Sequence, residues 1–131
     1  MASDFKDLKI WQEAYRLSLA VYKITAKFPT EEKFSLVDQL RRSSISVAAN
    51  IAESAGRYHG KDKINLLIIA RGSICETRSH LLIALGLKYL SKEKSEELEN
   101  DYEILSKQTN SFIGFLKKQK STNQLTNQLT N

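Results

Sequence analysis

Six charged or amide side chains near the middle of the chain are the residues best suited to chemistry: Gln39, Arg41, Arg42, Asn50, Glu53 and Glu76. Asn50 and Glu53 are close to the apolar Ile51, so we expect at least one of them to be partly buried. Burying such a group is costly unless it is hydrogen-bonded. The first expectation is therefore a structural polar network, between helices or between subunits, that joins Arg41 or Arg42 to Glu53 and Glu76.

Two functional interpretations of the same residues stay open. They could form a surface that binds phosphate or a partner protein. Alternatively, Arg42, Glu53 and Glu76 could form the unconventional site of an enzyme, between the second and third helices. An apolar-lined pocket around these three side chains would favour the enzyme, whereas a dry packed network would favour a scaffold.

Familiar catalytic and metal-binding patterns are missing from the sequence. Di-iron bundles use Glu-x-x-His spacing on paired helices, but Glu76 and His80 are one position too far apart and have no second copy. The pairs Arg57–His59 and Arg78–His80 are too closely spaced for a bundle-type ribonuclease, and no Ser-His-Asp or Cys-His set can be assembled. Cys75 is expected to be a small buried apolar group. We expect no metal, no cofactor and no enzymatic activity.

Four long helices are predicted from apolar residues that recur in steps of three and four. The first spans about residues 5–27 and ends before Pro29, which lacks a backbone donor. The second runs from an N-cap at Thr30 to about residue 55, the third covers about 61–90, and the fourth starts after a cap at Ser91. Short connections make successive helices antiparallel neighbours. The expected fold is all-α, a single-domain up-down antiparallel four-helix bundle.

Each helix carries a seam of residues expected to face the core. The seams are Ile10, Ala14, Leu17, Val21, Ile24 and Phe28; Val37, Leu40, Ser44, Val47 and Ile51; Leu67, Ala70, Ile74, Leu81 and Ala84; and Leu98, Tyr102, Leu105, Thr109, Phe112 and Leu116.

The first and third helices carry more apolar surface than these seams account for. Trp11, Tyr15 and Tyr22 form a second stripe on the first helix. The third helix is expected to be the most buried. It has a second seam, formed by Ile64, Ile68, Cys75, Leu82, Leu85 and Tyr89. Because one bundle needs only one broad apolar face per helix, the doubled face of the first helix predicts a homo-oligomer.

Positive charge is in mild excess, with 20 Lys and Arg against 15 Asp and Glu, which gives a net charge of +5. Such an excess is compatible with an acidic or nucleic-acid partner. In an up-down bundle the second and fourth helices are parallel, so their C-terminal ends lie together. Six basic residues there are the candidate nucleic-acid-binding residues: Arg57, Lys61, Lys63, Lys117, Lys118 and Lys120.

The bundle is expected to occupy residues 1–120. Residues 121–131 repeat Thr-Asn-Gln-Leu at 122–125 and 126–129, and this polar composition predicts a disordered tail. A single cysteine fits a reducing cytosol, and neither a secretory segment nor a bilayer-spanning run is visible. We expect a cytoplasmic protein with no membrane partner.

Several blocks of this sequence resemble the four-helix-bundle proteins encoded in intervening sequences of bacterial 23S rRNA genes. The blocks are Asp-Leu-Lys-Ile-Trp-Gln at 7–12, Phe-Pro-Thr-Glu-Glu at 28–32, the dense match at 39–53, and Ile-Ala-Arg-Gly-Ser-Ile-Cys-Glu at 69–76. The resemblance covers about residues 4–118. One departure is that Ser54 and Ala55 precede Gly56, where such proteins place a glycine directly after Asn-Ile-Ala-Glu.

The resemblance implies an up-down bundle that assembles as a ring-like homopentamer, and no known enzymatic activity. It also implies kinship with the accessory variability determinant of diversity-generating retroelements, a basic barrel that binds a reverse transcriptase and nucleic acid. The combined expectation is a non-enzymatic homo-oligomer, most simply a pentamer, that acts as a scaffold for RNA, DNA or a protein partner.

Overall fold

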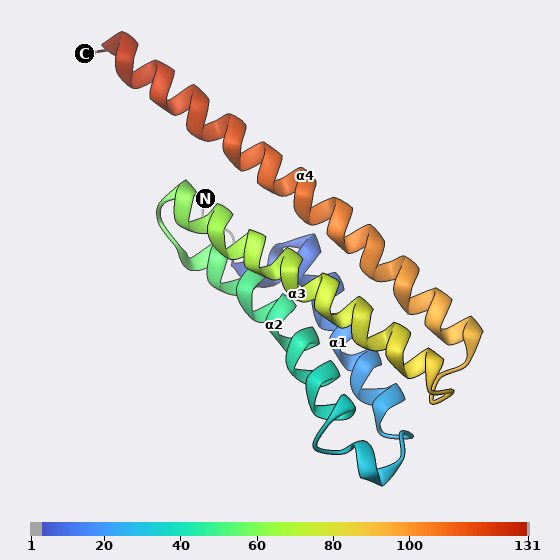
Figure 1. Cartoon of the computed structure of the whole chain (residues 1–131). Helices are drawn as coiled ribbons and strands as arrows, with labels where there is room; N and C mark the ends of the chain where they lie inside the picture. Colours follow the sequence, from blue (N-terminus) through green and yellow to red (C-terminus); the bar gives the residue numbers. More distant parts are fainter. Residues whose placement is uncertain (1–3, 131) are drawn as a thin grey trace.

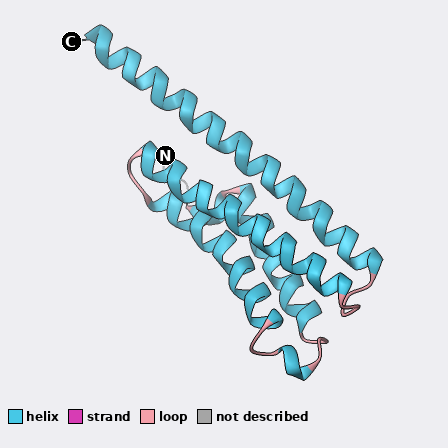
Figure 2. Ribbon diagram, in the orientation of Figure 1, coloured by secondary structure: helices cyan, strands magenta, loops and turns pink. Residues whose placement is uncertain are grey.

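Four α-helices form the fold: α1 (Lys9–Thr25), α2 (Leu36–Gly56), α3 (Gly60–Gly86) and α4 (Lys92–Thr130). Two short 3-10 helices, η1 (Phe5–Asp7) and η2 (Thr30–Glu32), precede α1 and α2. The computed structural model describes the backbone of residues 4–130 and the side chains of residues 4–119. Within these residues no strand occurs (Figures 1 and 2), and the predicted all-α fold is confirmed.

The helices are arranged so that each one packs against two others. Contacts join α1 to α2, α2 to α3, α3 to α4 and α4 back to α1, whereas among the described residues no Cα–Cα distance within 8 Å joins α1 to α3 or α2 to α4. Neighbouring helices run in opposite directions (Figure 1). This is the up-down antiparallel bundle that the short connections predict, with α1 and α3 on one diagonal.

The seams predicted from three- and four-residue spacing form the core. Every predicted position on α2 and the first seam of α3 is buried, and Leu17, Leu40, Ile51, Leu67 and Ile74 have no exposed surface. On α1 and in the loop after it, all predicted positions but the partly buried Ile24 are buried; on α4, all but Phe112. Burying a Leu or Ile side chain fully stabilises the fold by about 1.5–3 kcal/mol, so these seams supply most of the driving force.

The start of α2 differs from the sequence prediction. Thr30 begins the short helix η2, and α2 itself starts at Leu36. The reason is the Glu32 carboxylate, which accepts hydrogen bonds from the Ser35 hydroxyl at 2.7 Å and from the Leu36 backbone N–H at 3.4 Å. A side chain before the helix thereby satisfies one of its free N-terminal donors.

The turn between α3 and α4 ends the third helix four residues earlier than predicted. Lys88 adopts a left-handed conformation with φ of 64°. The Tyr89 N–H then donates to the Ala84 carbonyl at 3.0 Å and the Lys88 N–H to the Leu85 carbonyl at 2.9 Å, which is a Schellman C-cap. The predicted cap at the start of α4 is confirmed, because the Lys94 N–H donates to the Ser91 hydroxyl at 3.1 Å.

The C-terminal part of α4 also differs from the prediction. The helix continues to Thr130 and projects past the other three helices (Figure 1), where the sequence composition of 121–131 predicts a disordered tail. Neither Gly nor Pro occurs between 115 and 130, so nothing in the sequence interrupts the helical backbone. The side chains from residue 120 onward lie outside the described part of the chain.

Candidate binding surfaces

The predicted network of charged side chains between α2 and α3 is not formed. Arg42 Nε lies 2.9 Å from the Asp38 carboxylate, and Arg57 lies 2.6 Å from that of Glu53. Glu76 faces His80 at 3.5 Å. Every one of these partners is four positions away in the chain, the spacing at which side chains on one helix are neighbours.

The remaining members of the predicted network are also satisfied elsewhere. Arg41 turns toward α1, where its Nε donates to the Thr25 hydroxyl at 3.0 Å and its guanidinium lies 4.4 Å from the centre of the Tyr22 ring. Asn50 donates to the Ser46 carbonyl at 2.8 Å, and Gln39 is exposed. Because Arg42, Glu53 and Glu76 are exposed and face different neighbours, the chain does not bring these three side chains together into the site considered for an enzyme.

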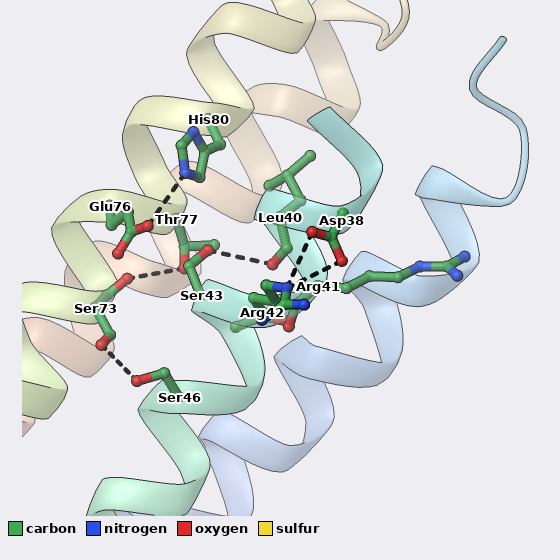
Figure 3. A network of polar contacts seen from close by, with 11 residues as sticks. Asp38, Leu40, Arg41, Arg42, Ser43, Ser46, Ser73, Glu76, Thr77 and His80 are labelled. Carbon is green, nitrogen blue, oxygen red and sulfur yellow. Dashed lines mark hydrogen bonds and ion pairs between the residues drawn. The ribbon is translucent and has the colours of Figure 1, made fainter. Parts of the chain in front are cut away.

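A line of neutral hydroxyl groups joins α2 to α3 instead (Figure 3). Thr77 Oγ1 lies 2.8 Å from both Ser43 Oγ and the Ser73 carbonyl oxygen. Ser73 Oγ in turn lies 2.8 Å from Ser46 Oγ. Ser43, Ser73 and Thr77 are buried, so these bonds satisfy hydroxyls that would otherwise be costly to enclose.

Two ion pairs that the sequence did not predict tie α4 to the rest of the bundle. Arg78 on α3 lies 2.6 Å from Glu99, and Arg16 on α1 lies 3.2 Å from Asp101. The hydrogen bond that Arg78 donates to the Glu99 carboxylate raises the pKa of Arg78 above its ordinary value. No local spacing signals such pairs, because their members are 21 and 85 positions apart in the chain.

The six candidate nucleic-acid-binding residues are in different situations. Arg57 is paired with Glu53, and Lys63 Nζ donates to the carbonyls of Ser54 and Ala55 at 3.3 and 3.4 Å. Lys61, Lys117 and Lys118 are exposed and have no carboxylate within ion-pair distance among the described residues. Lys120 lies outside the described side chains.

The predicted meeting of the α2 and α4 C-terminal regions is supported by a shared cavity. This cavity, of about 260 Å³, is lined by Ser54, Ala55 and Lys63 from the α2–α3 corner and by Phe112, Leu116 and Gln119 from α4. The free lysines 61, 117 and 118 therefore belong to one end of the bundle, which we call the basic end.

Large apolar side chains are exposed mainly on two helices that lie on one diagonal. On α1 these are Tyr15, Leu19 and Tyr22, with Leu19 54% exposed; on α3 and at its C-cap they include Ile69, Leu82, Ile83 and Leu87, with Ile83 49% exposed. We call these the α1 face and the α3 face. Fewer are exposed on the other two helices, namely Ile45 on α2 and Ile104 and Phe115 on α4. Phe5 and Trp11 extend the α1 face, because the Trp11 ring contacts the rings of Phe5 and Tyr15 at centroid distances of 5.0 and 5.2 Å.

The α3 face corrects two sequence predictions. The second seam of α3 is largely outside the core, since Ile68, Cys75 and Leu82 are all exposed. Cys75 is therefore not the buried group that its position between apolar residues predicts. The reason is topological: α3 packs only on α2 and α4, so a helix that is apolar on most sides leaves one side uncovered in a single chain.

The described residues contain no group of three or more His, Cys, Asp or Glu side chains that could hold a metal ion. None of the helices there is both long enough and apolar enough to cross a membrane.

The chain is similar to a known protein family and to a solved structure. The family model of the 23S rRNA-intervening sequence protein matches residues 6–111. The crystal structure of a protein with unknown function from the S23 ribosomal protein family of Bacteroides thetaiotaomicron is similar, with a TM-score of 0.72 and 26% sequence identity. The similarity covers 79% of this chain and 97% of that one. No curated protein sequence matches the chain.

Proposed function

Given that the chain belongs to the 23S rRNA-intervening sequence protein family, we propose that it is a non-enzymatic scaffold that assembles into a closed homo-oligomeric ring. One observation carries this proposal: the large apolar side chains of the α1 and α3 faces are about half exposed in the single chain. Contiguous exposed apolar surface of this kind is typical of protein–protein interfaces.

The placement of the two faces favours a ring over a simple dimer. Because α1 and α3 occupy one diagonal of the bundle, with no Cα–Cα distance within 8 Å between them, we infer that their exposed faces lie on opposite sides of it. Two different faces on opposite sides pair head to tail, the α1 face of one copy against the α3 face of the next. Such heterologous contacts close into rings when the rotation between copies permits. A pentamer is the state that the resemblance noted above implies.

Light scattering coupled to size exclusion tests the assembly. The wild-type chain is expected at about five times 14.9 kDa. Leu19→Glu and Ile83→Glu each place a charge in the proposed contact and should release monomers, because a buried unpaired charge is costly. Phe34→Glu is the matched control, since Phe34 is 87% exposed but belongs to neither face. A wild-type monomer at micromolar concentration, or rings unaffected by both substitutions, would refute the ring.

Nucleic acid is the second candidate partner, and a specific observation supports it. At the basic end, Lys61, Lys117 and Lys118 are exposed and lack carboxylate partners among the described residues. Repeated around a ring, these lysines would form a basic rim that contacts phosphate groups. Phosphate contacts position a protein without reading bases, so the binding should be weak in sequence preference and strong in salt dependence.

Binding measured at a series of salt concentrations distinguishes a nucleic-acid partner from a protein partner. For duplex DNA, log affinity should fall by about 0.9 per neutralised phosphate for each tenfold rise in salt. The Lys61/Lys117/Lys118 triple alanine variant should bind more weakly, with a shallower slope. The control is the Lys33/Lys92/Lys107 triple alanine variant, which loses the same charge elsewhere. Equal binding by both variants would exclude the basic end, and no binding of DNA or structured RNA by wild type at low salt would leave a protein partner.

A further inference from the structure

A pocket of about 410 Å³ lies at the end of the bundle opposite to the basic end. It is formed where the last turns of α1 meet the α3–α4 turn and the first turn of α4. Its lining includes three lysines, Lys23 from α1, Lys27 from the turn after α1 and Lys94 from α4, together with the apolar Ile24 and Leu90. No Asp or Glu lines this pocket.

Lys23 near the end of α1 and Lys27 in the turn after it have no acidic partner among the described residues. Several basic residues of the chain face an acidic residue four positions away, as in Arg42–Asp38, Arg57–Glu53 and Lys107–Glu103. Lys23 and Lys27 are also four positions apart, but both are cations, and neither has an ion-pair partner in the described residues. Two like charges that line one pocket repel each other, and an anion bound between them would relieve that repulsion.

The third lysine and the pocket wall are held in place by other contacts. The Lys94 ammonium lies 3.4 Å from the Glu97 carboxylate, and the Lys94 backbone N–H donates a hydrogen bond to the Ser91 hydroxyl. The Tyr89 hydroxyl donates to Glu32 at 3.2 Å, and its ring lies 5.5 Å from that of Phe28. The Tyr89 side of the pocket is therefore anchored to the segment before α2.

We propose that this pocket binds a small organic phosphate, with the phosphate among the three lysines and the organic part against Ile24 and Leu90. Several lysine ammonium groups act as point charges and suit a phosphate dianion. The volume exceeds what a bare phosphate needs, since a water molecule occupies about 30 Å³, and it falls in the range of small-molecule pockets. The proposal depends neither on ring assembly nor on nucleic-acid binding at the basic end.

Isothermal titration calorimetry on the full chain tests this site with three probes: adenosine monophosphate, inorganic phosphate and adenosine. Adenosine monophosphate should bind more tightly than inorganic phosphate, and adenosine should not bind measurably. The Lys23→Gln/Lys27→Gln variant should bind adenosine monophosphate about tenfold or more weakly. The matched control is Lys33→Gln/Lys88→Gln, which loses the same charge at the same end but outside the pocket.

Each outcome of this titration decides the assignment. A loss of affinity confined to the Lys23/Lys27 variant, with unchanged circular dichroism, supports the site. Equal binding by both variants would place any phosphate elsewhere and overturn it. Adenosine monophosphate that fails to bind wild type at millimolar concentration would overturn it too. If inorganic phosphate binds as tightly as adenosine monophosphate, the pocket does not recognise an organic part.

Discussion

The Thr77 hydroxyl oxygen of α3 lies 2.8 Å from the Ser43 hydroxyl oxygen of α2, and both side chains are buried. Neither side chain is charged, so this helix pair is joined at its centre by neutral hydrogen bonds. A buried hydrogen bond of this kind is specific, because a shift of one helix along the other would break it. Each hydroxyl would then keep only a carbonyl of its own helix, that of Ser73 for Thr77 and that of Leu40 for Ser43.

Thr77→Val should lower the free energy of unfolding by about 1–2 kcal/mol, because it keeps the side-chain shape but removes a buried hydroxyl that pairs with Ser43. The double variant Thr77→Val/Ser43→Ala removes both partners and should recover part of that loss. Chemical denaturation of the two single variants and the double variant measures the coupling. A coupling energy of zero would show that the two hydroxyls do not depend on each other.

Glu53→Ala and Glu76→Ala should each change the free energy of unfolding by less than about 0.5 kcal/mol, because both carboxylates are exposed and paired only within their own helix. Glu99→Gln should cost more, about 1–2 kcal/mol, since it weakens the bond to the partly buried Arg78. Thermal melts of the three variants compare them directly. A large loss for Glu53→Ala would restore the network expected from the sequence.

Much of the fold follows from spacing in the sequence, and much of the polar pairing does not. Leu17, Leu40 and Leu67 are buried as their three- and four-residue periodicity predicts, because that periodicity is fixed by helix geometry. The pairing of Glu53 with Arg57 was not predicted. Of the two polar residues beside Ile51, at least one of which was expected to be partly buried, Asn50 is partly buried and Glu53 is exposed. Contacts such as Arg16–Asp101 depend on which helices become neighbours and at what height, and no local pattern encodes these.

Lys88→Gly should raise the free energy of unfolding by about 0.5–1 kcal/mol. Lys88 has a φ of 64°, a left-handed conformation that glycine adopts without the steric cost borne by other residues. The backbone hydrogen bonds of the turn would be kept. Differential scanning calorimetry should show a higher Tm for Lys88→Gly than for wild type, and Lys88→Ala, which keeps a Cβ, should show no such gain.

Tyr102→Phe should raise the free energy of unfolding by about 1 kcal/mol. The Tyr102 side chain is fully buried, and its hydroxyl has no hydrogen-bond partner among the described residues. Removing an unsatisfied buried hydroxyl saves its desolvation cost. Tyr58→Phe is the control, because Tyr58 is almost fully exposed. A destabilised Tyr102→Phe variant would mean that the hydroxyl finds a partner, such as a bound water.

The Tyr102 phenol also predicts how stability depends on alkaline pH. Burial raises the pKa of Tyr102 well above its ordinary value of 10, and the charge of Arg16 opposes this only in part. The folded state therefore holds the phenol proton more tightly than the unfolded state, so the associated stability is complete below pH 10 and is lost as pH rises above it. Denaturation at pH 9 and pH 11 should show a larger loss for wild type than for Tyr102→Phe.

Two chemically different kinds of polar contact join the helices of this bundle. The hydroxyl line between α2 and α3 carries no net charge, whereas α4 is fastened to α1 and α3 through Arg16–Asp101 and Arg78–Glu99. Added salt screens partly exposed ion pairs but leaves neutral hydrogen bonds nearly unchanged. Among the contacts between helices, ionic strength thus acts mainly on those of α4: amide hydrogen exchange should quicken first along α4 as salt rises, while the α2–α3 hairpin stays protected.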